Sequence, residues 1–295
     1  MRQNEREESR KMYKILEKKI LNGSIVLMKV EAPRVAKAAR PGQFLIVRTG
    51  ERGERIPLTI CDYDPERGTV TIVVQVVGAS SRKIYHLNEG DSFTDVAGPL
   101  GQPSEFMKIE RENLARMHFL FIAGGLGAAP VYPQAGYLHG AGAAVDIIMG
   151  AKNSEMLILE QELRKVSDNL HICTDDGSRG EKGMVTAVME RLLQEGRRYD
   201  YAISIGPMIM MKFVTLTARR YELPLIVSLN TLMVDGTGMC GACRVTVGGK
   251  TKFACVDGPE FDARLVDFDE AISRQTMYRS MEAEADHKCR IAFGD

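Results

Sequence analysis

Short apolar runs, separated by turn residues, fill the first third of the chain. The runs are rich in β-branched residues and lie at 24–30, 43–48, 69–77 and 91–97. Gly, Pro and Asp stand between them, as in Arg40-Pro41-Gly42. Short strands at regular spacing predict an all-β barrel. We place it at residues 13–112, after a charged tail at residues 1–12.

From residue 113 the pattern changes to apolar runs that alternate with helical periodicity. Strands are expected at 118–123, 145–149, 171–174, 201–205 and 225–229. Helices are expected from Pro130 onward and at 154–166, 184–194 and 208–221. Strands that alternate with helices predict a parallel sheet, whose strands are apolar throughout because both faces are buried. Residues 113–229 are therefore predicted to form a Rossmann-like α/β domain.

The last part of the chain is rich first in Gly and Cys and then in charge. The Gly- and Cys-rich segment covers residues 230–260, and a charged, partly helical tail is expected at 261–295. A chain of 295 residues with 44% hydrophobic residues is long enough for two or three such modules.

Charge and hydropathy give no reason to expect a nucleic-acid or membrane partner. Lys+Arg and Asp+Glu number 39 each, and no run of 18 apolar residues is present. The charged N-terminal segment lacks the apolar stretch of a secretory signal, and three of the six cysteines are clustered. A cytoplasmic location and metal chemistry, rather than a disulfide scaffold, are expected.

The cysteine cluster has the spacing of an iron–sulfur site. Cys240, Cys243 and Cys255 follow Asp235 in the pattern Asp-x4-Cys-x2-Cys-x11-Cys. This is the plant-type [2Fe–2S] spacing with Asp235 in the first cysteine position. Thiolates suit iron and sulfide because they are soft anionic donors, and a carboxylate keeps the negative charge.

Two alternatives for this segment stay open. Asp235 could only cap the loop while a distant cysteine completes the site, and the candidates are Cys61, Cys173 and Cys289. The three thiols could also hold a structural zinc ion.

A glycine-rich turn follows the first strand of the α/β part. Gly124, Gly125, Leu126 and Gly127 stand between this strand and the helix expected from Pro130. Glycines let a pyrophosphate approach the backbone, and the helix N-terminus offers free N–H groups. The turn is therefore a candidate site for NAD(H) or NADP(H).

Two more loops end strands of the same sheet, and ligands of such sheets bind at the carboxyl ends of strands. Their candidate residues are Asp175, Asp176, Gly206, Pro207 and Met208. Ordinary turns are the alternative, and Met210 and Met211 are expected to be core residues. Asp146 has the spacing of a ribose-binding acid but falls within a strand.

Taken in order, the segments of the chain resemble the ferredoxin–NADP reductase-like flavoproteins, which have an FAD barrel followed by an NAD(P) lobe. The resemblance implies an R-x-Y-S or R-P-x-S flavin motif, matched here by Pro57, Leu58 and Thr59, with Thr59 in the Ser position. Ile56 stands where the family has arginine, and Arg55 is expected to supply the charge. The remaining FAD-binding residues implied by the resemblance are Val73, Val74, Gln75, Gly78, Ser80 and Ser81.

Within this group the chain resembles the dihydroorotate dehydrogenase electron-transfer subunits, which add a C-terminal [2Fe–2S] loop. It resembles more closely the small (alpha) subunits of NADH-dependent reduced ferredoxin:NADP oxidoreductases, through Asp235 and through the tail at 266–271 and 287–289. That resemblance implies electron bifurcation in a heterodimer with a larger flavin and iron–sulfur subunit, and exchange with ferredoxin through the complex.

The expected function is therefore electron transfer between NAD(H) or NADP(H), FAD and a [2Fe–2S] cluster. No residue is predicted to act as a catalytic acid or base, because the five histidines are scattered. The first alternative is a dihydroorotate dehydrogenase electron-transfer subunit. The alternative of another class is a non-enzymatic, zinc-binding interaction module.

Overall fold

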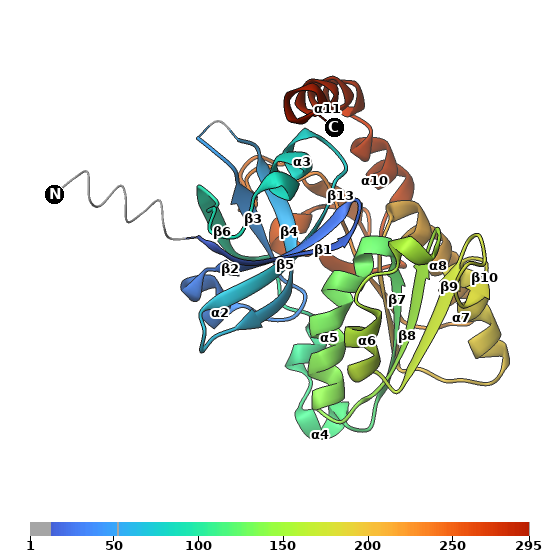
Figure 1. The fold of residues 1–295 in the computed structure, drawn as a ribbon. Helices are drawn as coiled ribbons and strands as arrows, with labels where there is room; N and C mark the ends of the chain where they lie inside the picture. Colours follow the sequence, from blue (N-terminus) through green and yellow to red (C-terminus); the bar gives the residue numbers. More distant parts are fainter. Residues whose placement is uncertain (1–12, 52, 295) are drawn as a thin grey trace.

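The structure is a computed structural model that describes residues 13–51 and 53–294. Its strands form one large sheet in each half of the chain, and a two-stranded hairpin carries part of the cysteine-rich segment (Figure 1). The expected tail at residues 1–12 lies outside the described residues. In the part of the chain that is described, no helix combines the length and the apolar character needed to cross a membrane.

The first sheet has six antiparallel strands in the order β1-β2-β5-β4-β3-β6. The strands are β1 (Ile15–Asn22), β2 (Ile25–Glu31), β3 (Phe44–Arg48), β4 (Arg55–Asp64), β5 (Thr69–Gln75) and β6 (Asp95–Leu100). A bridge between Lys14 and Ser92 joins the start of β1 to the segment that leads into β6, so the sheet closes into a barrel. Helices α2 (Pro33–Ala38) and α3 (Ala79–His86) connect its strands.

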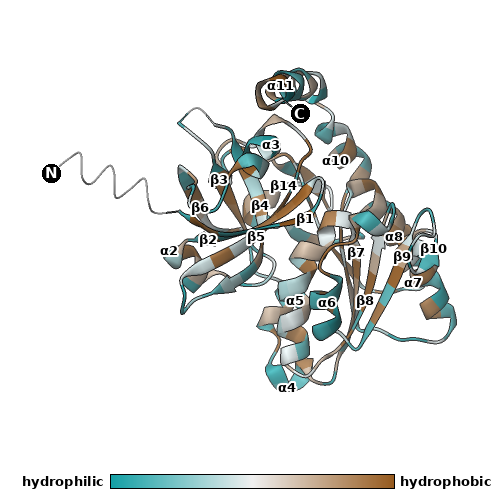
Figure 2. Cartoon of the chain, in the orientation of Figure 1, coloured by the Kyte–Doolittle hydropathy of each residue, from teal (hydrophilic) through white to brown (hydrophobic). Residues whose placement is uncertain are grey.

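The second sheet has seven strands in the order β10-β9-β8-β7-β11-β12-β15, parallel except for β15. The strands are β7 (His118–Gly124), β8 (Ala144–Ala151), β9 (Asn169–Thr174), β10 (Glu181–Lys182), β11 (Tyr201–Ile205), β12 (Leu225–Ser228) and β15 (Glu260–Asp262). Hydrophobic residues are concentrated on the strands of both sheets (Figure 2).

Helices cover both faces of this parallel sheet. The helices are α5 (Ala128–Gly140), α6 (Glu160–Lys165), α7 (Val185–Gln194) and α8 (Met208–Arg220). Phe119 and Phe121 of β7 pack with α5 and α6, whereas Leu120 and Ile122 pack with α7 and α8. This alternation follows from the period of two in a strand, and it places a buried layer on each face. A short helix α4 (Arg111–Leu114) and the 3-10 turns η1 (Glu105–Lys108), η2 (Gly125–Gly127) and η3 (Ser154–Met156) complete this half.

The rest of the chain returns to the barrel. The hairpin of β13 (Arg244–Val247) and β14 (Lys250–Phe253) leads to α9 (Ala254–Asp257) and then to β15 at the sheet edge. Helices α10 (Phe268–Gln275) and α11 (Arg279–Phe293) follow, and α11 lies above the barrel (Figure 1).

The fold class predicted from the sequence is confirmed, with differences in individual elements. The helix expected at 154–166 is interrupted, since Leu159 has a left-handed φ of 60° between η3 and α6. The strand expected at 91–97 begins at Asp95 and runs to Leu100. The strand β1 and the helices α2 and α3 were not predicted.

Candidate functional site

The flavin residues predicted on β4 divide between the two faces of that strand. Arg55, Pro57 and Thr59 share one face, because successive side chains of a strand alternate. Leu58 belongs to the barrel core, and Ile56 packs against that core. Ile56 therefore replaces the family arginine at a position that faces away from Arg55, Pro57 and Thr59.

Strands β4 and β5 diverge beside these residues. Within the described chain, their pairing ends at Ile60 of β4 and Ile72 of β5. Beyond that point β4 pairs only with β3, and Val73, Val74 and Gln75 of β5 pair only with β2. Backbone N–H and C=O groups on these two strand edges thus have no ladder partner in the described chain. Such groups are strong donors and acceptors, and they can bind the polar edge of a planar ring.

The turn from β5 into α3 holds the predicted glycine and serine residues. Ser81 Oγ accepts hydrogen bonds from the N–H groups of Val77 (2.9 Å) and Gly78 (3.0 Å). It also donates to the Gly78 carbonyl at 2.9 Å. The Ser80 hydroxyl donates to the Glu54 carboxylate, which brings the start of β4 next to this turn. Gly78, Ser80 and Ser81 therefore lie together at the N-terminus of a helix, where an anion is favoured.

Arg55 connects the flavin strand to the cysteine-rich loop. Its Nη1 donates to Asp95 Oδ2 at 2.9 Å, and its Nη2 donates to the backbone carbonyl of Asp235 at 3.4 Å. The guanidinium group thus already has two partners in this structure. From the sequence, Arg55 is expected to supply the charge of the missing family arginine, whereas in the structure it points toward the loop that carries Asp235.

The glycine turn after β7 touches the turn after β11. A Cβ on Gly127 would lie 2.0 Å from the Ile205 carbonyl oxygen, and a Cβ on Gly206 would lie 3.1 Å from Gly124 Cα. Gly125 has a left-handed φ of 53°, and a Cβ there would meet no atom within 4 Å. The two predicted turns, Gly124–Gly127 and Gly206–Met208, therefore form one surface at the carboxyl ends of neighbouring strands. Met208 itself is buried at the start of α8.

The other acidic candidates lie apart from this surface. Asp175 and Asp176 are exposed after β9, which β8 separates from β7. Hydrogen bonds from Ser178 hold the pKa of Asp176 below its usual range. Asp146 is fully buried near the start of β8, where it accepts hydrogen bonds from Tyr199 (2.9 Å) and Asn169 (2.7 Å). Asp146 is thus a core residue, and this arrangement excludes a ribose contact.

The cysteine-rich loop packs against the face of the barrel that carries the flavin strand. A Cβ on Gly236 would lie 2.5 Å from Ile46 Cδ1 and 2.9 Å from Leu100 Cδ1. Ile46 pairs with Pro57 on β4. Only glycine allows the loop to approach this closely, and Gly236 also has a φ of 84°. The loop after Asp235 therefore lies directly beside the predicted flavin site.

The three clustered thiols occupy different environments. Cys243 and Cys255 are buried with their sulfur atoms 3.2 Å apart, while Cys240 is exposed. Hydrogen bonds from the backbone N–H groups of Ala242 and Asp235 lower the pKa of Cys240. Asp235 thus lies beside Cys240, and its carboxylate accepts a hydrogen bond from the Thr237 N–H at 3.0 Å.

This donor set fits a [2Fe–2S] cluster better than a single ion. In the described residues no three His, Cys, Asp or Glu side chains converge to hold one metal ion. A binuclear cluster spreads its four ligands over two irons, and so it needs pairs of donors rather than one point of convergence. Cys243 and Cys255 form one such pair, and the backbone N–H of Asp235 contacts the thiol of Cys240, the remaining cysteine of the loop.

The distant cysteines are held in other elements. Cys61 is buried in β4, and burial raises the pKa of its thiol to about 12. Cys173 is buried in β9, where burial raises the pKa to about 11. Cys289 lies in α11, with its sulfur 3.5 Å from the Ala79 carbonyl oxygen of α3.

Glu260 is a titratable group that the sequence analysis did not single out. It lies in β15, accepts a hydrogen bond from Ser104 at 2.9 Å, and has its pKa raised to about 7 by burial. Gln134 of α5 is fully buried, and its side chain acts with Ser104 to oppose the rise in the pKa of Glu260. Glu260 stands in a short charged stretch, so no local pattern marks it.

Comparison with known proteins finds a family model over the cysteine-rich segment and relatives over most of the chain. A family model described as the iron-sulfur cluster binding domain of dihydroorotate dehydrogenase B matches residues 230–267. A Thermotoga maritima protein, described as a dihydroorotate dehydrogenase B (NAD(+)), electron transfer subunit homolog, is 49% identical over 253 residues. These cover 86% of this chain and 86% of that protein.

Two solved structures show the same arrangement of the chain. One chain of the NADH-dependent reduced ferredoxin-NADP oxidoreductase structure, from a study of flavin-based electron bifurcation, is 45% identical with a TM-score of 0.86. The match covers 94% of this chain and 97% of that one. A ferredoxin NADP+ reductase from Neisseria gonorrhoeae with bound FAD and NADP is 14% identical with a TM-score of 0.56, over 75% of this chain and 92% of that one. The latter likeness concerns the fold alone.

Proposed function

We propose a function from the premise that this chain belongs to the family of dihydroorotate dehydrogenase B electron transfer subunits and their homologues. It is an NAD(P)H-dependent flavin and iron–sulfur oxidoreductase subunit that moves electrons between NAD(H), FAD and a [2Fe–2S] cluster. When bound, these groups supply hydride transfer and the conversion of electron pairs into single electrons. The chain supplies their positions.

The observation that carries this proposal is the contact between the flavin strand and the cluster loop. Arg55 on β4 donates to the Asp235 carbonyl at 3.4 Å, and Gly236 packs against Ile46 on the adjacent strand. The residues proposed to hold FAD and those proposed to hold the cluster are therefore neighbours. The paired glycine turns after β7 and β11 would bind the nicotinamide nucleotide at the carboxyl edge of the α/β sheet.

Each proposed cofactor site has a defined set of residues. FAD would be bound by the diverging strands and the α3 turn, through Arg55, Pro57, Leu58, Thr59, Val73, Val74, Gln75, Gly78, Ser80 and Ser81. The nucleotide would be bound by Gly124, Gly125, Leu126, Gly127, Gly206, Pro207 and Met208, with Asp175 and Asp176 at the edge. Asp235, Cys240, Cys243 and Cys255 would bind the cluster, with Asp235 in the first cysteine position of the plant-type spacing.

We further infer an electron-bifurcating complex in the cytoplasm. The likeness to the oxidoreductase chain extends over 94% of this chain. A larger subunit with flavin and iron–sulfur groups would be the partner, and ferredoxin would exchange electrons through that complex. The alternative partner is a dihydroorotate dehydrogenase catalytic subunit, which the names of several relatives support.

The test is cofactor analysis of the chain purified without oxygen, alone and together with its native partner. We expect FAD, two irons and two sulfides per chain, and bleaching of the flavin absorbance by NADH. The complex should reduce NADP+ with NADH and reduced ferredoxin, and it should not oxidise dihydroorotate. A colourless chain that stays without flavin and sulfide after reconstitution would contradict the proposal.

The fourth cluster ligand is tested by Asp235→Ala. Loss of an anionic donor should lower the iron content by about half or more and weaken the EPR signal of the reduced cluster. Asp235→Cys, which restores the common ligand set, should retain full iron. Unchanged iron, sulfide and EPR signal in Asp235→Ala would reject Asp235 as a ligand.

A further inference from the structure

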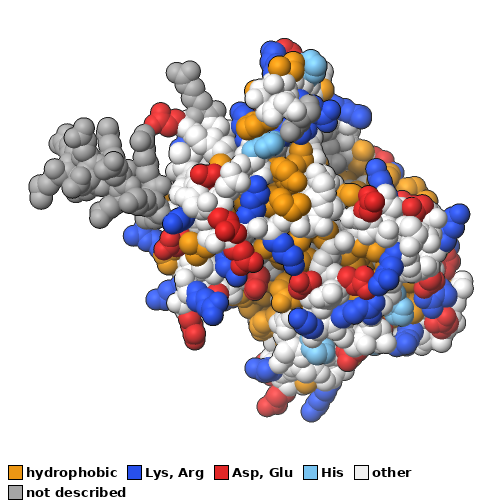
Figure 3. Space-filling model, viewed as in Figure 1, with side chains coloured by type: hydrophobic (Ala, Val, Ile, Leu, Met, Phe, Trp, Pro, Cys, Tyr) orange, Lys and Arg blue, Asp and Glu red, His pale blue; other side chains and the backbone are white. Residues whose placement is uncertain are grey.

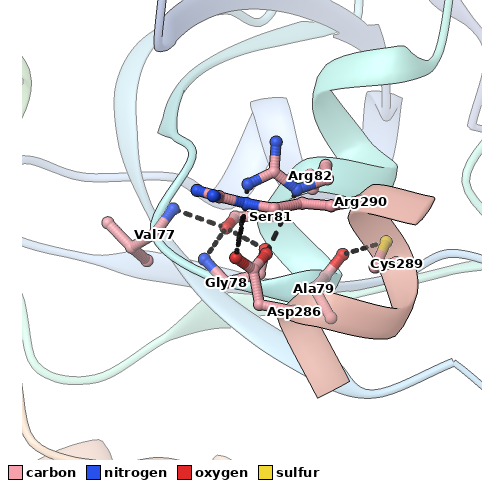
Figure 4. Close-up of polar contacts among 8 residues, drawn as sticks. All are labelled: Val77, Gly78, Ala79, Ser81, Arg82, Asp286, Cys289 and Arg290. Carbon is pink, nitrogen blue, oxygen red and sulfur yellow. Dashed lines mark hydrogen bonds and ion pairs between the residues drawn. The ribbon is translucent and has the colours of Figure 1, made fainter. Parts of the chain in front are cut away.

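Helix α11 packs against α3, and only its Cys289 was considered from the sequence, as an alternative cluster ligand. It contacts the first, fourth and last residues of that helix. Cys289 Sγ lies 3.5 Å from the Ala79 carbonyl oxygen, Asp286 pairs with Arg82, and Phe293 stacks on His86 with ring centroids 4.2 Å apart. The two helices therefore form one unit (Figure 4).

An ion pair shielded from solvent lies at the centre of this contact. Arg82 Nε and Nη2 donate to the two carboxylate oxygens of Asp286 at 3.1 and 3.4 Å. The two side chains are only 11% and 19% exposed, and Arg290 adds a contact to Asp286 at 3.1 Å. By contrast, the ion pair of Lys288 with Glu284 on α11 has side chains 72% and 69% exposed. A shielded bidentate pair fixes geometry, whereas an exposed pair contributes little.

The start of α3 depends on such support. The helix has eight residues, too few to be stable without tertiary contacts, and these come from α11 and, through Ile84, from the barrel core. In the described chain, the N–H groups of Ala79 and Ser80 have no acceptor, because Ser81 Oγ accepts from the N–H groups of Val77 and Gly78 instead. These free N–H groups belong to the α3 turn that the proposed function assigns to FAD, and a helix N-terminus suits its pyrophosphate. The Cys289 thiol of α11 contacts the carbonyl oxygen of Ala79, the same residue whose N–H group is free.

We propose that α11 is a latch for FAD and that Asp286 is a positioning residue of the FAD site. Docking of α11 through Asp286 and Arg82 fixes the N-terminus of α3 in the orientation that binds the pyrophosphate. By linkage, FAD binding and α11 docking favour each other. This inference rests on the proposed function, because it assumes that FAD binds at α3.

The first experiment measures FAD affinity in the full chain. Asp286→Asn keeps the size of the side chain and removes its charge, and it should raise the FAD dissociation constant by about 5- to 100-fold. Asp286→Glu should recover a large part of the affinity. Glu284→Gln breaks the exposed pair on the same helix and should leave the dissociation constant unchanged. Equal FAD affinity in wild type and Asp286→Asn would overturn the latch.

The second experiment uses the Cys289 thiol as a reporter of docking. The side chain is buried, at 7% exposure, between α11 and α3. Saturating FAD should slow alkylation of Cys289, measured by mass spectrometry, by about 5-fold or more, and Asp286→Asn should speed it. Cys61 and Cys173, at 2% and 1% exposure, are internal controls that should stay unlabelled. Identical Cys289 labelling with and without FAD would contradict the coupling.

The possible results distinguish a failure of the proposed function from a failure of the latch. Wild-type chain that binds no FAD would reject the proposed function itself. Wild-type chain that binds FAD, with neither an effect of Asp286→Asn nor protection of Cys289, would reject only the latch. If Asp286→Asn does not fold, the effect of FAD on wild-type Cys289 labelling still decides the question.

Discussion

At the scale of single residues, the glycine turn after β7 divides its glycines between two tasks. Gly127 gives room for the Ile205 carbonyl oxygen, which would lie 2.0 Å from a Cβ. Gly125 has free space around it but adopts a left-handed φ of 53°. The sequence predicts a glycine-rich turn here, but it does not show which glycine serves packing, because the partner strand is about 80 residues away.

This difference predicts unequal costs of substitution. Gly127→Ala should lower the free energy of unfolding by about 2–3 kcal/mol. The Ile205 carbonyl that the new Cβ would meet belongs to β11, so it can move only if that strand moves. Gly125→Ala should cost about 1 kcal/mol, the price of a left-handed residue with a side chain. Urea unfolding of the two variants measures both values. If both variants lose the same unfolding free energy, small backbone shifts relieve the close contact with the Ile205 carbonyl oxygen.

Glu260 predicts a dependence of stability on pH. Its folded-state pKa of about 7 lies above its usual 4.5, so between these values the folded chain keeps a proton that the unfolded chain releases. The free energy of unfolding should therefore fall as the pH rises from about 4.5 to 7, by on the order of 3 kcal/mol. Glu260→Gln should remove this decline, whereas Glu105→Gln, at an exposed neighbour, should keep it. Parallel pH profiles for wild type and Glu260→Gln would contradict the assignment.

At the scale of elements, periodicity predicts the buried strands well and the short helices poorly. The strand at 201–205 is found at its predicted bounds, because an apolar run buried on both faces has few alternatives. The helix expected at 154–166 is broken at Leu159, whose left-handed backbone no apolar pattern reveals. Helix α3 was missed because part of its support comes from α11, some 200 residues later, and the rest from the barrel core through Ile84. The divergence of β4 and β5 depends on pairing, which a single strand's sequence does not encode.

At the scale of the whole molecule, the barrel, the cluster loop and the α/β sheet meet along one boundary. Hydrophobic side chains gather in a strip between the barrel and the α/β half, below α11 (Figure 3). Cysteine spacing predicts the cluster ligands. The order of motifs along the chain predicts the barrel and the α/β domain that follows it. Only the fold shows that Arg55 and Asp235, 180 positions apart, are in contact.

That contact predicts a role for Arg55 in retaining the cluster. Arg55→Met removes the pair with Asp95 and the bond to the Asp235 carbonyl, and it should speed iron release to a chelator by about 3-fold or more. Global stability should change by no more than about 1 kcal/mol, because the pair is partly exposed. Lys29→Met, which breaks the exposed pair with Glu17 elsewhere on the barrel, serves as the control. Equal release rates in both variants would show that the loop holds its iron without the barrel.

The pairing of Arg82 with Asp286 also sets an order of events during synthesis. The two residues are 204 positions apart, so the ribosome makes the barrel long before it makes α11. A nascent chain can close the barrel and complete the cysteine loop while α3 still lacks its companion helix. Secure flavin loading is thus delayed until translation has passed Asp286, and the iron ligands are all synthesised before it.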